Sequence, residues 1–91
     1  MSVIALQYAL NDMERIRDDG KPHVFSIEFI RGTGKLKGFR KKINQVIKLG
    51  HAAGHNHKER GTIPLYDIAQ KRPVTPFISN LIFYNDLKIK H

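Results

Sequence analysis

The spacing of apolar residues changes once along this chain, near residue 24, and that change limits the folds open to it. From residue 3 to residue 16, apolar side chains recur every three or four positions, which is the period of an amphipathic helix. From Val24 the segment HVFSIEFIRG alternates apolar and polar side chains, which is the period of a half-buried strand. The sequence therefore predicts a helix over residues 2–18, closed by Gly20 in the left-handed conformation, and strands after it.

Residues 36–49 fit two periods. Their apolar side chains can form a helical stripe, but the same segment can also be placed along an extended chain. A strand and a glycine-rich turn precede it, and a hairpin return is the local expectation after such a turn. We favour a strand that continues towards Leu49 with a bend or a bulge.

The second half of the chain shows short apolar segments separated by turn residues. The polar, glycine-rich stretch at residues 50–61 predicts a long loop. TIPLYDI (62–68) predicts a strand, and PVTPFI (73–78) predicts an edge strand because it holds two prolines. The closing residues 79–90 predict a tight hairpin that turns at Asn85-Asp86.

These elements together predict an α+β fold that is mainly β. A chain of 91 residues supports one domain, residues 1–91, with an N-terminal helix within 1–20 and a β domain over 23–91. Five or six short antiparallel strands leave exposed edges, and a small, curled, partly open barrel handles such edges best.

Charge is the strongest functional signal. The net charge is +8, and between residues 31 and 60 there are nine basic residues and one acid. A surface of this kind attracts polyanions, most commonly nucleic acid, and otherwise an acidic protein partner. The candidate phosphate-binding residues are Arg31, Lys35, Lys37, Arg40, Lys41, Lys42, Lys48, Lys58 and Arg60.

The stretch IRGTGKLKGF (30–39) contains half of a nucleotide-binding loop motif but fails its other positions. In a P-loop a glycine would precede Gly34 by five residues and a hydroxyl residue would follow Lys35; Phe29 and Leu36 occupy those positions. We therefore expect a strand-to-strand turn that uses the freedom of glycine at positive φ. Its lysines remain candidates for contact with a polymer backbone.

The sequence gives little support for metal binding or for catalysis. The histidines of HAAGHNH (His51, His55, His57) lie in a predicted loop, where histidines are more often solvated than ligating. A fourth ligand would have to come from His23, His91 or an acid such as Glu59, so we expect no metal site. Cysteine is absent, and no acid, serine or threonine stands in a recognisable catalytic motif. We expect no enzyme and no cofactor.

Aromatic residues are interleaved with the cations. Small barrels bind single strands with basic residues along the backbone and aromatic residues that stack on bases. With five phenylalanines in so short a chain, however, most are expected in the core, including Phe39 and Phe83. The lysines are therefore the favoured contact residues.

The order of these segments resembles that of small basic SH3-like β-barrel proteins of bacterial phages and mobile elements. The resemblance is carried by FSIEF, the basic segment after it, PLYDI and ISNLIFYNDLKI, and it covers most of residues 24–90. It implies an SH3-like barrel of five or six strands beneath the N-terminal helix. In SH3 domains an LYD-type segment comes at the start rather than in the second half, so no peptide-groove residue is carried over.

The leading hypothesis is a non-enzymatic protein that binds nucleic-acid phosphates largely without sequence specificity. The alternative is a phage virion or assembly protein whose basic face contacts an acidic partner or the packaged genome. Polar residues interrupt every apolar run near the N-terminus, and no stretch approaches the ~18 apolar residues of a membrane span. We therefore expect no membrane association, a cytoplasmic location in a bacterial host or a place in a virion, and a possible homo-oligomer.

Overall fold

The alternating segment forms the central strand of the protein. A computed structural model of the chain describes residues 2–32, 34–49 and 61–91. In it, β2 (Phe25–Ile30) buries Phe25, Ile27 and Phe29 on one face. Ser26 and Glu28 are half-buried on the other face, as the alternation predicts.

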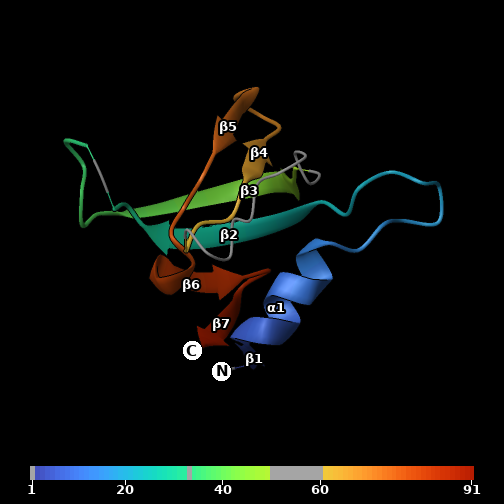
Figure 1. Ribbon diagram of the computed structural model, residues 1–91, viewed down its shortest axis with the longest axis horizontal. Coiled ribbons are helices and arrows are strands. Elements are labelled where there is room, and N and C mark those ends of the chain that lie inside the picture. The colour runs from blue at the N-terminus through green and yellow to red at the C-terminus, as the bar shows by residue number, and fades with distance from the viewer. Residues whose placement is uncertain (1, 33, 50–60) are drawn as a thin grey trace.

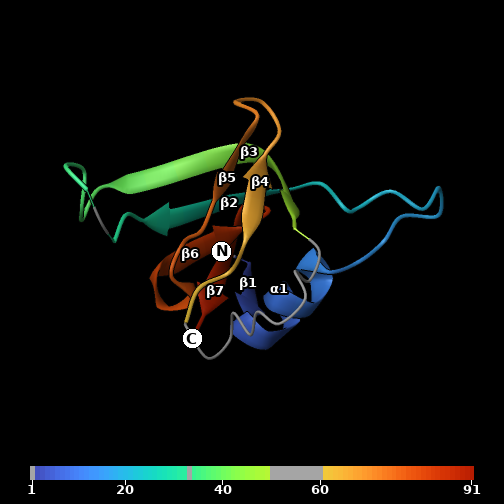
Figure 2. The same cartoon turned by 45° about the horizontal axis from the view of Figure 1, so that its top comes forward.

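Seven strands form one open sheet in the order β1-β7-β6-β2-β3-β4-β5. The strands other than β2 are β1 (Val3–Ala5), β3 (Arg40–Lys48), β4 (Leu65–Asp67), β5 (Arg72–Val74), β6 (Leu81–Tyr84) and β7 (Leu87–Lys90). Figures 1 and 2 show that the β4–β5 ribbon stands steeply across β2 and β3, so the sheet is strongly twisted. The prediction of a mainly β, α+β chain is confirmed, with one strand more than the five or six expected.

The additional strand comes from the segment predicted to begin the helix. Residues 3–5 pair in parallel with β7, with Ile4 opposite Ile89. The helix α1 covers only Leu6–Met13 and packs beside β1 and β7. The predicted start at residue 2 is therefore wrong, because pairing with β7 satisfies the backbone of this segment and places Ile4 against the core.

The predicted end of the helix at residue 18 is also wrong. After Met13 the chain forms a projecting antiparallel loop, in which Ile16 bridges Pro22 and the Arg17 amide donates to the Lys21 carbonyl at 2.8 Å. Gly20 has the predicted positive φ of 80°, but it lies in the tip of this loop rather than at a helix end. Met13 is buried but Ile16 is 69% exposed, so the apolar stripe packs against the rest of the protein only as far as Met13.

Within the ambiguous segment 36–49, β3 (Arg40–Lys48) is a strand with a bulge, and residues 36–38 belong to the turn before it. Ile43 pairs with Ile27, and Val46 pairs with Phe25, so two residues of β3 stand opposite the single residue Ser26. The bulge keeps Ile43 and Val46 on the core face although they are three residues apart. That spacing is the reason the sequence fits a helical period equally well.

The remaining strands are shorter than predicted, but their turns agree with the sequence. Residues 68–71 form the turn between β4 and β5, and β5 lies at the sheet edge as its proline predicts. Asn85 and Asp86 have φ of 48° and 64° and form the two-residue turn between β6 and β7. Thr62 makes only an isolated bridge with Phe77, so the strand predicted at 62–68 is reduced to β4.

The core lies between α1 and one face of the sheet. It is formed by the buried side chains of Ala9, Met13, Phe25, Ile27, Phe29, Ile43, Val46, Ile63, Leu65, Leu81, Tyr84 and Ile89. No helix among the residues described is long and apolar enough to cross a bilayer.

Candidate nucleic-acid interface

The β2–β3 hairpin carries most of the predicted basic residues and extends beyond the rest of the sheet (Figure 1). Its ladder continues past the strands, since the Arg31 amide donates to Phe39 at 2.9 Å and the Gly38 amide donates to Arg31 at 2.8 Å. Gly34 and Gly38 have φ of 82° and 89°, which only glycine adopts readily. The glycine-rich stretch is therefore a strand-to-strand turn, as predicted.

The cations of the hairpin lie in two places, at the turn (the tip) and along the paired strands (the stem). Lys35 and Lys37 are exposed in the turn and form no ion pair with any part of the chain that the structure describes. Arg40 and Lys42 follow on β3, with side chains 67% and 49% exposed. Arg31 and Lys41 are half-buried. The hairpin thus combines unpaired charge at its tip with partly compensated charge along its stem.

Two carboxylates compensate the charge of the stem. Arg40 Nη1 lies 3.3 Å from Glu28 Oε2, and Lys42 Nζ lies 3.0 Å from Asp86 Oδ1. The Lys42–Asp86 pair is exposed on both sides, and such pairs contribute only about 0–1 kcal/mol, so a phosphate can replace Asp86 at little cost.

A row of side chains crosses the sheet on the face opposite the core. Directly paired residues share a face, and Glu28 pairs with Lys42 on one side and with Phe83 on the other. Phe83 in turn pairs with Lys88, and Lys88 with Val3. We call the face that carries Lys42, Glu28, Phe83, Lys88 and Val3 the outer face.

Phe39 and Phe83 are not core residues, contrary to expectation. Phe39 is 64% exposed next to Arg40, and Phe83 is half-buried on the outer face. A bulge explains Phe83: Phe29 pairs with Leu81 and Glu28 with Phe83, so β6 carries Ile82 as an extra residue. In a regular strand without the bulge, Leu81 and Phe83 would lie on the same face.

Lys48 lies apart from the hairpin cations. It stands at the far end of β3, its side chain is 13% exposed, and its Nζ donates to Glu14 Oε1 at 2.5 Å. This contact ties the end of α1 to β3. The predicted residues Lys58 and Arg60, and the histidines of the predicted loop, lie outside the described residues.

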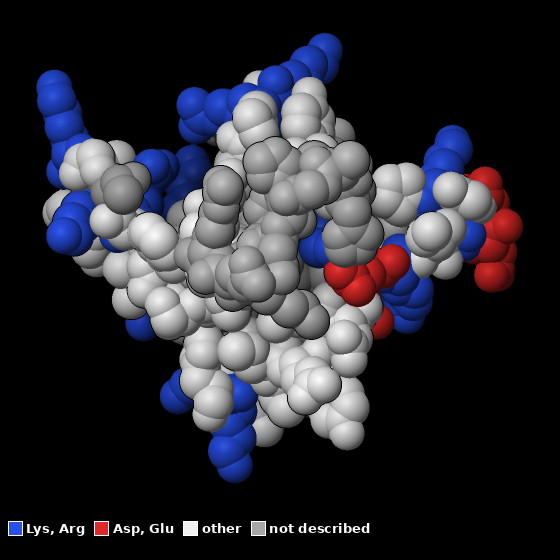
Figure 3. Space-filling view, viewed as in Figure 1, with Lys and Arg blue, Asp and Glu red and all other residues white. Residues whose placement is uncertain are grey.

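Figure 3 shows how the charge is distributed on one face of the molecule. Lysine and arginine atoms gather at the ends of projecting segments, including the β2–β3 hairpin and the β4–β5 turn. The acidic atoms in this view lie near the loop that follows α1, where basic atoms lie beside them. The hairpin end shows basic atoms and no acidic ones in this view.

Sequence reasoning missed a polar cluster at the end of α1. The Tyr84 hydroxyl donates a short hydrogen bond to Asp12 Oδ2, and His23 Nε2 lies 3.0 Å from the same hydroxyl. Because the Tyr84 hydroxyl uses its proton in the hydrogen bond to Asp12, it can only accept from His23. His23 Nε2 is therefore the donor in that contact. Arg15 completes the cluster at 3.5 Å from Asp12. These residues are 72 positions apart at most, and no sequence spacing signals the contact.

We expect Tyr84→Phe to destabilise the fold by about 1–2 kcal/mol at neutral pH, because Asp12 and His23 lose a buried partner. Burial first, then the hydrogen bond and negative charge of Asp12, raise the pKa of Tyr84 well above its usual 10.0. The folded pKa exceeds the unfolded one, so this contribution is complete below about pH 10 and is lost as pH rises further.

Urea unfolding followed by circular dichroism between pH 7 and 11 checks this. Above pH 10 the free energy of unfolding should fall more steeply in the wild type than in Tyr84→Phe, by up to ~1.4 kcal/mol per pH unit. Tyr8→Phe, at an exposed position of α1, is the control and should follow the wild type. Equal alkaline slopes for Tyr84→Phe and the wild type would contradict the assignment.

Among the described residues, no three histidine or acidic side chains are placed to hold a metal ion. Comparison with protein-family models, curated proteins and solved structures finds no match to this chain.

Proposed function

We propose that this chain is a non-enzymatic nucleic-acid-binding protein that engages phosphates through the β2–β3 hairpin and the outer face, largely without sequence specificity. The observation that carries the proposal is the pair Lys35 and Lys37, exposed and unpaired among the described residues at the tip of a projecting hairpin. Cations held in this way have no ion pair to break before they contact a phosphate, and they gain from counterion release at a polyanion.

The outer face supports the same proposal. Lys88 and Lys90 are exposed on β7, on the same face as Lys42 by register. They form no ion pair within the ranges that the structure describes. No helix is positioned as a recognition helix among the described residues, since α1 packs on β1 and β7. Contacts to phosphate rather than to base edges therefore dominate the expected affinity.

On the fold, we propose that strands β2 to β6 are a variant of the small SH3-like barrel. The antiparallel pairing of β2 with β3, of β3 with β4 and of β4 with β5, together with the strong twist, supports this kinship. The open edges at β1 and β5 are where the chain departs from a closed barrel.

A second candidate function is assembly, with the chain as a virion or connector subunit. Val3 and Tyr8 are 59% and 71% exposed near the unpaired edge of β1, which favours contact with another protein.

Affinity for single- and double-stranded DNA, measured by fluorescence anisotropy against salt, tests the leading proposal. With about five phosphate contacts, log K should fall with log salt with a slope of about −3.5 for single-stranded DNA and about −4.5 for double-stranded DNA. Flat, millimolar binding at low salt would refute it. Light scattering after size exclusion separates the candidates, because a defined ring or higher oligomer supports assembly and a DNA-binding monomer supports the leading proposal.

A further inference from the structure

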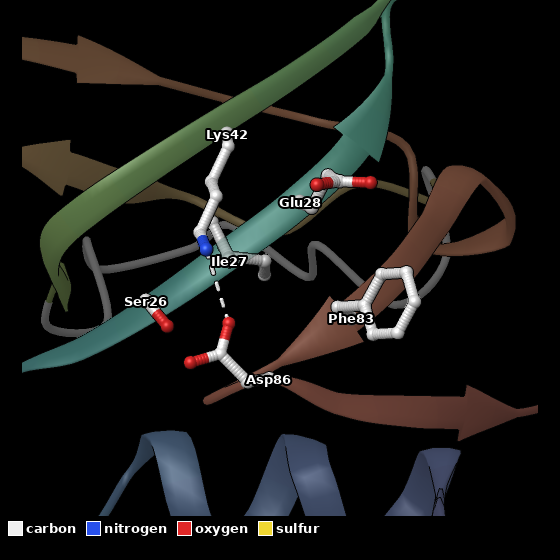
Figure 4. Close-up of a pocket in the computed structure, with 6 residues that line it drawn as sticks. All are labelled: Ser26, Ile27, Glu28, Lys42, Phe83 and Asp86. Carbon is white, nitrogen blue, oxygen red and sulfur yellow. Dashed lines mark hydrogen bonds and ion pairs between the residues drawn. The ribbon is translucent and has the colours of Figure 1, made fainter. Parts of the chain in front are cut away.

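A pocket of about 170 Å³ opens on the outer face, between β2, β3 and the β6–β7 turn. Its lining residues are Ser26, Ile27, Glu28, Lys42, Phe83 and Asp86. Figure 4 shows Phe83 from β6 on one side of the pocket, Lys42 and Glu28 above it, and Asp86 below. The pocket lies among the cations of the proposed interface.

Phe83 has charged residues beside it on both neighbouring strands. Its direct cross-strand partners are Glu28 and Lys88, and the Lys42–Asp86 ion pair lies across the pocket from it. The bulge at Ile82 is what places the ring there instead of in the core. A half-buried aromatic ring beside balanced charges offers a π-face to a flat, partly polar ligand.

The carboxylates suit a base edge better than a phosphate. The Glu28 side chain is 19% exposed and already receives a hydrogen bond from Arg40. A carboxylate accepts hydrogen bonds from amino and ring N–H groups of bases, as glutamate does from the cytosine amino group. Phosphates would instead meet Lys88 on one side of the ring and Lys42 on the other.

We infer that Phe83 stacks on one base of a single-stranded nucleic acid, with Glu28 facing the edge of that base and Lys42 and Lys88 facing the adjacent phosphates. This inference rests on the proposed function and names its substrate class. A base in a duplex is already stacked and paired, so only a single strand presents its face to a ring fixed on a sheet.

The experiment uses the absence of tryptophan from the chain. In Phe83→Trp the indole becomes the only tryptophan, and its fluorescence should be quenched by oligo(dC) of about 12 nucleotides, a length that spans a typical single-strand site. An abasic oligonucleotide of equal length keeps the phosphates but lacks bases, and should bind without quenching. Tyr8→Trp, on exposed α1, should not be quenched by either probe.

Affinity gives a second readout. Phe83→Leu should bind oligo(dC) about 10-fold more weakly than wild type, with an unchanged salt slope and unchanged affinity for the abasic probe. An unquenched Phe83→Trp, quenching by the abasic probe, or equal quenching by duplex would overturn the inference. If the wild type still shows salt-dependent binding in that case, the proposed function stands without it. Flat millimolar binding by the wild type would overturn both.

Discussion

Replacing Lys35, Lys37, Arg40 and Lys42 together by glutamine should weaken nucleic-acid binding at least about 100-fold at low salt. Four phosphate contacts would be lost, so the slope of log K against log salt should become shallower by about 3. Glutamine is shorter but keeps a flexible polar side chain, and these positions lie on the surface, so stability should change by no more than about 0.5 kcal/mol per site. Fluorescence anisotropy across a salt series, with circular dichroism of each variant, measures both effects.

The matched control removes four cations elsewhere. Arg17, Lys21, Lys71 and Arg72 are exposed in the loop after α1 and around the β4–β5 turn. Their replacement by glutamine lowers the net charge by the same amount. If binding depends on where the cations lie, this control should retain most of the wild-type affinity for nucleic acid. Equal losses in the two variants would show that net charge alone governs binding and would contradict the hairpin as the interface.

Ile27→Ala should cost about 3–4 kcal/mol of the free energy of unfolding, the largest single-residue effect we expect. Ile27 is 1% exposed in the central strand, paired with Ile43 on one side and Tyr84 on the other. Truncation leaves a cavity between rigid strands that cannot close around it. Chemical denaturation at neutral pH measures the loss, which is a large fraction of the ~5–14 kcal/mol typical of a domain this size.

Ile30→Ala is the control for this change. It alters the same residue type in the same strand, but Ile30 is 37% exposed at the strand end, opposite Arg40. We expect a loss below about 1 kcal/mol there. Similar losses at the two positions would contradict the assignment of the core face of β2.

Elements with a local cause were predictable from the sequence. The alternation over β2 requires one buried face whatever lies against it, and the Asn85-Asp86 pair tolerates the positive φ of a tight turn. The glycines of the hairpin could be assigned to a turn because their spacing fails the nucleotide-loop pattern. The exposed lysines of the tip followed from the same reasoning, since a turn between strands projects into water.

Errors arose where a distant segment decided the outcome. The pattern of residues 3–16 is helical, yet β7, more than 80 positions away, pairs with residues 3–5 and shortens the helix. The sequence position of Lys48 predicts one more cation of the basic segment, but in the fold Lys48 forms an ion pair with Glu14. The contact of Asp12 with Tyr84 likewise depends on how α1 packs on the sheet.

From the sequence alone it follows that this chain is mainly β, strongly basic, and turned by glycines between its second and third strands. Those properties depend on residue type and on spacing along one segment. The face that each residue occupies in the strands after β2 depends on the tertiary structure. One extra residue at a bulge reverses the alternation of the two faces along the rest of that strand. That reversal moved Phe83 from the expected core to the outer face, where it becomes the candidate contact for a base.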